Sequence, residues 1–174
     1  VWAIARRIIG APRAMAKRRA ARRREQGVDA LSDAVIALQA GDPARARLMA
    51  REAQARLPDN GAAKLLEARA DLALGEWGSA REEYRALIDN PKTALAALSG
   101  LYEQAMAQHR PDAALTFAHK AFAISPQLGW ASTAVFNDLV NQRDWPGALS
   151  MIEAEPARQP EERADKARKQ AVLN

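Results

Sequence analysis

Apolar and small residues recur along this chain with the spacing of helices rather than of strands. In residues 28–40, Leu31, Ala34, Val35 and Leu38 lie at i, i+3, i+4 and i+7, which is the stripe of an amphipathic helix. Comparable stretches follow at about 43–57, 61–74, 77–89, 93–108, 111–124, 129–142 and 146–155. They are rich in Ala, Leu, Arg and Glu and poor in β-branched residues, a composition that favours helix. The pattern predicts an all-α protein.

The helix predicted at 43–57 combines apolar residues with several arginines. We expect Leu48, Met49 and Leu57 to face the interior. The arginines are expected to face solvent, and they are Arg45, Arg47, Arg51 and Arg56.

Residues that end and begin helices recur at one spacing. Gly41 and Gly75 both lie at the ends of predicted helices, where glycine tolerates a positive φ. Asp42 and Pro43 then form an N-cap and a first-turn proline. Alanines near the start of four helices repeat at the same interval that separates the two glycines, namely Ala46, Ala80, Ala114 and Ala148. Because the glycines that end helices and the alanines that begin them recur at the same interval, the sequence indicates a structural repeat.

The interval matches the period of a tetratricopeptide (TPR) unit, about 34 residues, in which two antiparallel helices bury their apolar faces by stacking on the next unit. The predicted fold is therefore an all-α, right-handed TPR-like α-solenoid of about four helix-turn-helix units, preceded by a basic helical arm. The repeat domain is expected to span 27–157, with units at about 27–60, 61–92, 93–128 and 129–157. Residues 158–174 are expected to begin a further helix or repeat.

The positive charge is concentrated at one end of the chain. Residues 1–25 hold nine of the 26 basic residues and one of the 21 acidic ones, so the other 149 residues carry 17 basic and 20 acidic groups. We expect residues 1–26 to be the end of a membrane anchor and a basic juxtamembrane segment, helical but broken or kinked near Gly10 and Pro12. No run of ~18–20 apolar residues, the length that spans a bilayer, is present.

The candidate membrane-surface residues are one aromatic side chain and the basic side chains of this arm. They are Trp2, Arg6, Arg7, Arg13, Lys17, Arg18, Arg19, Arg22, Arg23 and Arg24. Anionic lipid headgroups attract such residues with roughly 1 kcal/mol each. The alternatives are a solvated charge run that acts only as a topology signal, and binding to a nucleic-acid backbone. Nucleic acid ranks last and is not a predicted partner, because no aromatic residues are interleaved to stack on bases.

Few residues in the sequence indicate a catalytic, cofactor-binding or metal-binding site. The chain has no cysteine, which excludes disulfides and thiolate metal sites. His109 and His119 are ten residues apart, not at the spacing that places two metal ligands on one helix face. No nucleophile constellation or carboxylate pair has a meaningful spacing. We predict no catalytic, cofactor-binding or metal-binding residues, and a role that is not enzymatic.

The tryptophans of the repeats are assigned to packing. Trp77 and Trp145 lie at equivalent positions in the first turn of a second helix, where an aromatic can pack much like a hydrophobic staple. Trp130, at the start of a first helix, is also placed in the core.

The first helices of TPR units line a concave groove, and their equivalent positions are candidate partner-binding sites. The candidates are Arg69, Glu103, Asn137 and Asn141. Three sets of equivalent positions are expected to face the groove, namely 31, 65, 99 and 133; 35, 69, 103 and 137; and 39, 73, 107 and 141. None of them is lysine, which disfavours a clamp for the terminal carboxylate of a peptide. The mixed groove suits a helix or an extended protein segment.

Several phrases resemble the HemY family of bacterial inner-membrane proteins associated with haem biosynthesis. The arginine-rich arm leading into 27–31 (Gly-Val-Asp-Ala-Leu) is similar to that family's junction between anchor and repeats. Residues 65–70 (Leu-Leu-Glu-Ala-Arg-Ala) and 98–102 (Leu-Ser-Gly-Leu-Tyr) resemble the starts of its second and third units. Residues 129–131 and 144–149 resemble the fourth. Turns at His109-Arg110 and at Pro146 depart from the family pattern, which places the local turn geometry in question.

The resemblance implies a protein of the bacterial inner membrane, with membrane helices upstream, more repeats downstream and a late role in protoporphyrin and haem synthesis. The arginines after the anchor favour the cytoplasmic side for the repeats. The implied partners are proteins, haem-biosynthesis enzymes among them, and the anionic membrane surface. An unrelated flavin-dependent oxidase shares the name, but the chain has no glycine-rich dinucleotide fingerprint that would support that enzyme.

The predicted function is a non-catalytic, membrane-anchored TPR scaffold for protein interactions, associated with haem or protoporphyrin biosynthesis. One alternative is a carrier that binds haem or protoporphyrin directly, since His, Met and Tyr can serve as axial ligands. Replacement of His119 would test the carrier. The other alternative is a general membrane-anchored assembly adaptor unrelated to haem.

Overall fold

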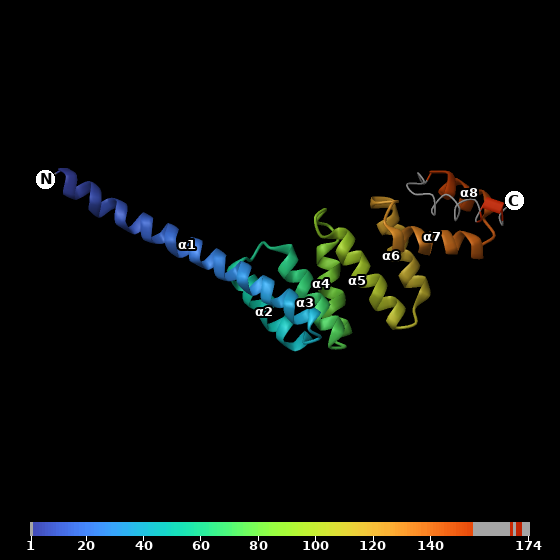
Figure 1. The fold of residues 1–174 in the computed structure, drawn as a ribbon, viewed down its shortest axis with the longest axis horizontal. Helices are drawn as coiled ribbons and strands as arrows, with labels where there is room; N and C mark the ends of the chain where they lie inside the picture. Colours follow the sequence, from blue (N-terminus) through green and yellow to red (C-terminus); the bar gives the residue numbers. More distant parts are fainter. Residues whose placement is uncertain (1, 155–167, 169, 172–174) are drawn as a thin grey trace. The chain divides into compact units, whose positions relative to one another are not determined.

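The computed structural model describes residues 2–154, 168 and 170–171 of the 174-residue chain, and all elements in this part are α-helices (Figure 1). In order they are α1 (Trp2–Gln39), α2 (Pro43–Arg56), α3 (Gly61–Ala73), α4 (Trp77–Leu87), α5 (Ala94–Ala107), α6 (Pro111–Ile124), α7 (Gly129–Asn141) and α8 (Trp145–Ala154). The predicted all-α class is confirmed, and the predicted helix ends lie close to the observed ones. The expected further helix at 158–174 lies mostly outside the described residues.

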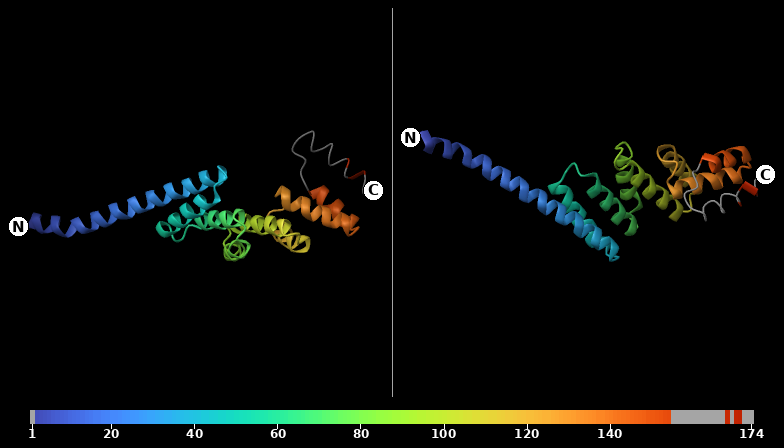
Figure 2. Two further views of the ribbon diagram at one scale, coloured as in Figure 1. Left: turned by 90° about the horizontal axis from the view of Figure 1, so that it is seen from below. Right: turned by 45° about the horizontal axis from the view of Figure 1, so that its top comes forward.

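The basic arm and the first predicted repeat helix form one continuous helix. α1 is 38 residues long and passes through Gly10 and Pro12 without interruption, so of the break or kink expected there, the break is wrong. A proline removes one backbone hydrogen bond, and the surrounding Ala and Arg residues are strong helix formers that continue the helix on both sides. In both views of Figure 2 the N-terminal part of α1 extends beyond α2, α3 and α4 as one continuous helix.

The chain divides into two compact units, Val1–Ala97 and Leu98–Asn174. In the first unit α1 packs on α2 and α3, α2 packs on α3, and α3 packs on α4. The contacts between the first three helices are made largely by alanines. Ala30, Ala53 and Ala63 form one buried cluster with Leu31 packed against it, and Ala37, Ala46 and Ala70 form another with Leu38.

Small side chains let these helices approach closely. Gly27 of α1 is buried, and a Cβ atom added to it would lie 2.7 Å from Cγ of Leu57. On α2 the buried positions are Ala46, Ala50 and Ala53. Leu48 is 62% exposed, so its expected inward orientation is wrong. The alanine stripe, not the larger apolar residues, is the face of α2 that packs.

The turns after α1, α3, α5 and α7 share one geometry. Positive φ angles among the described residues occur at Gly41 (75°), Gly75 (80°), His109 (54°) and Arg143 (60°), which follow one another at equal intervals. At each turn this residue and the next donate backbone hydrogen bonds back into the preceding helix, as in Arg143 N to Val140 O (3.0 Å) and Asp144 N to Leu139 O (2.9 Å). This is the Schellman pattern that ends helices. The departure at His109 therefore changes the residue type but not the turn.

The helices that follow these turns are α2, α4, α6 and α8, and a side-chain N-cap like the one predicted at Asp42 is present at α2 and α8. The Asp42 carboxylate accepts a hydrogen bond from the Arg45 amide (3.0 Å), and that of Asp144 accepts one from the Gly147 amide (3.1 Å). Glu76 and Arg110 occupy the same position without a side-chain cap. The four alanines that follow are buried as the repeat requires: Ala46, Ala80, Ala114 and Ala148.

In the second unit α6 packs on α7 and α7 packs on α8. Tyr102 of α5 contacts Trp130 of α7, with ring centroids 4.9 Å apart at an angle of 39°, so Trp130 takes part in packing as expected. Trp77 of the first unit and Trp145 of the second are 37% and 40% exposed, which contradicts their assignment to the core. At the very start of a helix, the side chain reaches past the region that the neighbouring helices cover.

Candidate functional site

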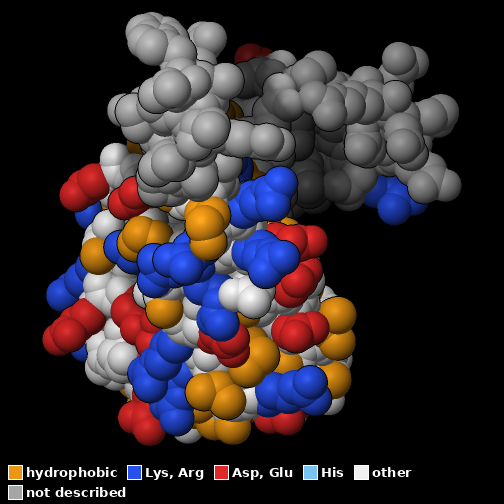
Figure 3. All heavy atoms as spheres, turned by 90° about the vertical axis from the view of Figure 1, so that its left-hand side faces the viewer, with side chains coloured by type: hydrophobic (Ala, Val, Ile, Leu, Met, Phe, Trp, Pro, Cys, Tyr) orange, Lys and Arg blue, Asp and Glu red, His pale blue; other side chains and the backbone are white. Residues whose placement is uncertain are grey.

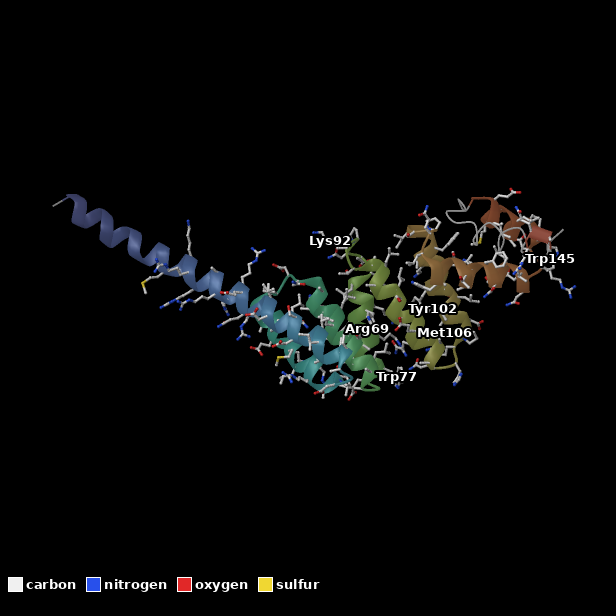
Figure 4. The ribbon with its side chains drawn as sticks, in the orientation of Figure 1. Arg69, Trp77, Lys92, Tyr102, Met106 and Trp145 are labelled. Carbon is white, nitrogen blue, oxygen red and sulfur yellow. The ribbon has the colours of Figure 1, made fainter. Side chains whose placement is uncertain are left out.

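The four predicted partner-binding residues are all exposed on the helices where the repeat pattern places them. Arg69 lies on α3 in the first unit and is labelled in Figure 4. Glu103 lies on α5, where its carboxylate accepts a hydrogen bond from the Ser99 hydroxyl (3.3 Å). Asn137 and Asn141 lie one turn apart on α7. A common groove for these residues stays a prediction.

The predicted membrane-surface residues all belong to α1. Lys17, Arg18, Arg19, Arg22, Arg23 and Arg24 are exposed. The side chains of Trp2, Arg6, Arg7 and Arg13 lie outside the described residues. The six described basic residues surround the helix instead of sharing one face, because they follow one another within eight positions at about 100° per residue. Figure 3, which looks at this end of the molecule, shows basic, acidic and hydrophobic side chains interspersed on the described surface.

A polar network between α2, α3 and α4 was not predicted from the sequence. Its centre is a pair of buried carboxylates one turn apart on α3, Glu67 and Asp71, which are 8% and 1% exposed. Arg51 of α2 donates a hydrogen bond from Nε to Glu67 (2.5 Å), and Gln54 donates another from Nε2. Burial of these two carboxylates is tolerable because their oxygens have hydrogen-bond donors.

Asp71 has a donor on each neighbouring helix. Arg47 of α2 contacts its Oδ1 at 3.4 Å, and the Ser79 hydroxyl of α4 donates to its Oδ2 at 2.7 Å. Arg47 is half-buried, contrary to the expectation that it would face solvent. The network thus joins three consecutive helices, in part through Arg47 and Arg51, which were expected to face solvent.

Glu83 of α4 lies beside the carboxylates of Glu67 and Asp71 and has a raised pKa. Burial, followed by the negative charges of Glu67 and Asp71, raises the pKa of Glu83 to about 7, and Arg51 acts in the opposite direction. Its Oε2 atom is buried and has no hydrogen-bond partner among the described residues. Three carboxyl groups facing two arginines leave one excess negative charge, which protonation of Glu83 removes.

The spacing of charged residues in the sequence could have predicted this network, whereas the spacing of apolar residues does not reveal it. Arg47 and Arg51 are four residues apart on α2, and Glu67 and Asp71 are four residues apart on α3. Residues at this spacing share a helix face, so two antiparallel helices can align an arginine pair with a carboxylate pair.

The second unit contains a smaller ion pair. Nε2 of His119 on α6 lies 3.0 Å from Oδ2 of Asp138 on α7, and Gln142 donates to the other carboxylate oxygen at 2.9 Å. The hydrogen bonds from His119 and Gln142 lower the pKa of Asp138. His119 is exposed, so this pair lies on the surface.

No group of three or more potential metal ligands occurs within the described part of the chain. Within the α2–α4 network, the carboxylates of Glu67 and Asp71 accept hydrogen bonds from arginine, glutamine and serine side chains. Within the same residues, no helix is both long and apolar enough to cross a membrane.

Comparison with known proteins addresses the first unit. Residues 1–75 match the HemY protein N-terminus. The predicted resemblance to the HemY family is confirmed over this region, which comprises α1, α2 and α3 and ends at the positive-φ residue Gly75. No curated protein and no solved structure matches the chain.

Proposed function

We propose that this chain is a non-catalytic interaction scaffold, associated with haem biosynthesis, whose helices continue as a TPR-like stack. The observation that carries the proposal is the combination of the HemY match with four turns of one geometry at equal intervals along the chain. A repeated helical hairpin presents a rigid surface to partners and contains no reaction centre by itself. The exposed Arg69, Glu103, Asn137 and Asn141 are the proposed contacts with a protein partner.

We further propose that α1 holds the repeats at the cytoplasmic surface of the bacterial inner membrane. Its basic side chains would attract anionic headgroups at roughly 1 kcal/mol per residue close to the surface. Because these residues surround the helix, different subsets can face the lipid and other surfaces. Co-sedimentation of the purified chain with vesicles of anionic lipid, but not of neutral lipid, tests this part. Binding should weaken as salt increases, because screening shortens the range of the attraction.

The scaffold role is tested by proximity labelling from the protein in cells. We expect haem-biosynthesis enzymes among the labelled proteins, and less labelling from a variant with Arg69→Glu and Asn137→Arg. A control variant, Lys92→Glu, changes an exposed residue in the turn before α5 and should label as the wild type does. Labelling of other assemblies in place of haem enzymes would instead indicate a general adaptor.

The purified chain distinguishes the scaffold from a carrier. Titration with haem and with protoporphyrin should leave the Soret band of the ligand unchanged. A shift in that band that disappears in His119→Ala would overturn the scaffold in favour of the carrier. Turnover of protoporphyrinogen by the chain would overturn the non-catalytic role.

A further inference from the structure

On one face of α1, basic residues come first and acidic residues follow. Two copies of this face in antiparallel orientation would therefore place opposite charges against each other. Its members follow one another at steps of three or four residues, with two adjacent residues at the centre, and therefore lie on one side of the helix. They are Met15, Arg18, Arg22, Glu25, Gln26, Asp29, Asp33 and Ile36, here named the α1 outer face. Every member is exposed. Read from its N-terminal end, the face is apolar, basic, acidic and apolar.

This face is separate from the side of α1 that packs in the protein, except that the Gln26 amide oxygen accepts a hydrogen bond from Nε of Arg56 on α2 (3.4 Å). The packed side consists of Gly27, Ala30, Ala34 and Ala37, which are buried against the following helices. At about 100° per residue, the centres of the two sides lie roughly 110° apart around the helix. A second helix can therefore lie along the α1 outer face without displacing α2 or α3.

The apolar ends and the charges of this face are unused within the described residues. Met15 is 56% exposed and Ile36 is 64% exposed, and they are among the most exposed large hydrophobic side chains. Within the described residues, the charged members of the face take part in no ion pair. The acidic half thus has no basic partner, and the basic half has no acidic one.

We propose that the α1 outer face binds the same face of a second copy of this chain, with the two helices antiparallel. The midpoints of Met15 and Ile36, of Arg18 and Asp33, and of Arg22 and Asp29 all fall between residues 25 and 26. A two-fold axis at that point places each residue opposite its complement. Symmetry then repeats each contact, which gives four ion pairs flanked by two contacts between Met15 and Ile36.

Charge complementarity selects this partner and this direction. A parallel pair of α1 helices would place arginine against arginine and aspartate against aspartate, which is repulsive. The antiparallel pair leaves Lys17 and Arg24 on other sides of the helix, so they remain available to an anionic surface along which the helices lie. The proposal goes beyond the scaffold function and does not depend on it.

A charge exchange tests the pairing with the purified chain. One variant carries Arg18→Asp and Arg22→Asp, and the other carries Asp29→Arg and Asp33→Arg. Each alone should lose self-association by roughly tenfold or more, because four attractive pairs become four repulsive ones. Mixed in equal amounts, the variants should form a heterodimer, since every charge then has an opposite partner. Analytical ultracentrifugation measures this, and circular dichroism checks that the helices are retained.

Cross-linking tests the direction, because the chain has no cysteine of its own. A mixture of Met15→Cys and Ile36→Cys chains should give a heterodimer with a short thiol-reactive linker, and neither chain alone should cross-link. Cross-linking of Met15→Cys to itself would show parallel helices and overturn the proposal. A wild-type chain that stays monomeric at high concentration and low salt would also overturn it, as would exchanged variants that still self-associate.

Discussion

Helices α1 and α3 each carry two carboxylates one helical turn apart, and the two pairs have opposite surroundings. Glu67 and Asp71 on α3 are buried beneath the arginines of α2. Asp29 and Asp33 on α1 are exposed and have no ion-pair partner among the described residues. Spacing within a helix decides which side chains share a face. A neighbouring helix with complementary donors decides whether that face becomes interior or surface.

The largest expected difference between the buried carboxylates of α3 and the exposed ones of α1 is in how much their replacement lowers the free energy of unfolding. Asp71→Ala should lower the free energy of unfolding by about 2–3 kcal/mol, because it leaves Arg47 and the Ser79 hydroxyl without their buried acceptor. Asp33→Ala on the exposed face should change it by less than about 0.5 kcal/mol. Urea denaturation followed by circular dichroism measures both.

Asp71→Asn serves as the control for this comparison. The amide oxygen can still accept from Ser79, while the charge that attracts Arg47 is lost, so an intermediate destabilisation is expected. Equal losses in Asp71→Ala and Asp33→Ala would contradict the difference drawn between the faces.

The next effect is a pH dependence from Glu83. Its pKa rises from 4.5 to about 7 on folding, so folding favours the protonated carboxyl. The stability that Glu83 contributes is therefore fully present below its unfolded pKa and declines as pH rises from about 4.5 through 7. After allowance for partial exposure, we expect a loss of about 1–2 kcal/mol.

Glu83→Gln keeps the shape of the side chain and removes its ionisation. The variant should match the wild type near pH 4.5 and exceed it in stability at pH 8, as measured by denaturant titrations at the two pH values. Glu82→Gln, which changes an exposed neighbour, is the matched control and should not alter the pH dependence. A Glu83→Gln variant as sensitive to this pH range as the wild type would locate the effect elsewhere.

The smallest effect is expected at the surface pair of the second unit. The lowered pKa of Asp138 means that its contribution is present above the unfolded pKa and is lost as pH falls through the folded value. Because His119 is exposed and solvent screens the pair, Asp138→Asn should cost well under about 1 kcal/mol. NMR titration of the Asp138 carboxyl in the wild type and in His119→Ala would measure the shift directly. A pKa that stays unchanged in His119→Ala would show that His119 does not cause it.

The sequence predicted the helices well because their ends are encoded locally. Gly41 and Gly75 favour positive φ, and Asp42 caps the next helix through its own side chain. His109 and Arg143 adopt the same conformation without being glycine, which composition could not show. There the hydrogen bonds of the turn impose a backbone conformation that the residue type disfavours.

The prediction of the side chains was less successful. Leu48 was assigned inward by its hydrophobicity, yet the alanines of α2 form the packed face. Arg47 was assigned outward by its charge, yet it reaches a buried aspartate. In both cases close helix packing outweighs single-residue preference, because alanine permits short approaches and a paired charge can be buried.

The sequence alone determined the helices, their regularly spaced turns, the basic end and the resemblance to HemY. These depend on contacts between residues close together in the chain. Only the tertiary structure decided that α1 continues unbroken, that α2 and α3 match their arginines and carboxylates, and that Glu83 is buried beside two other acids. Those outcomes depend on which helix faces meet, and the free energy of a buried charge is set by the neighbours it meets there.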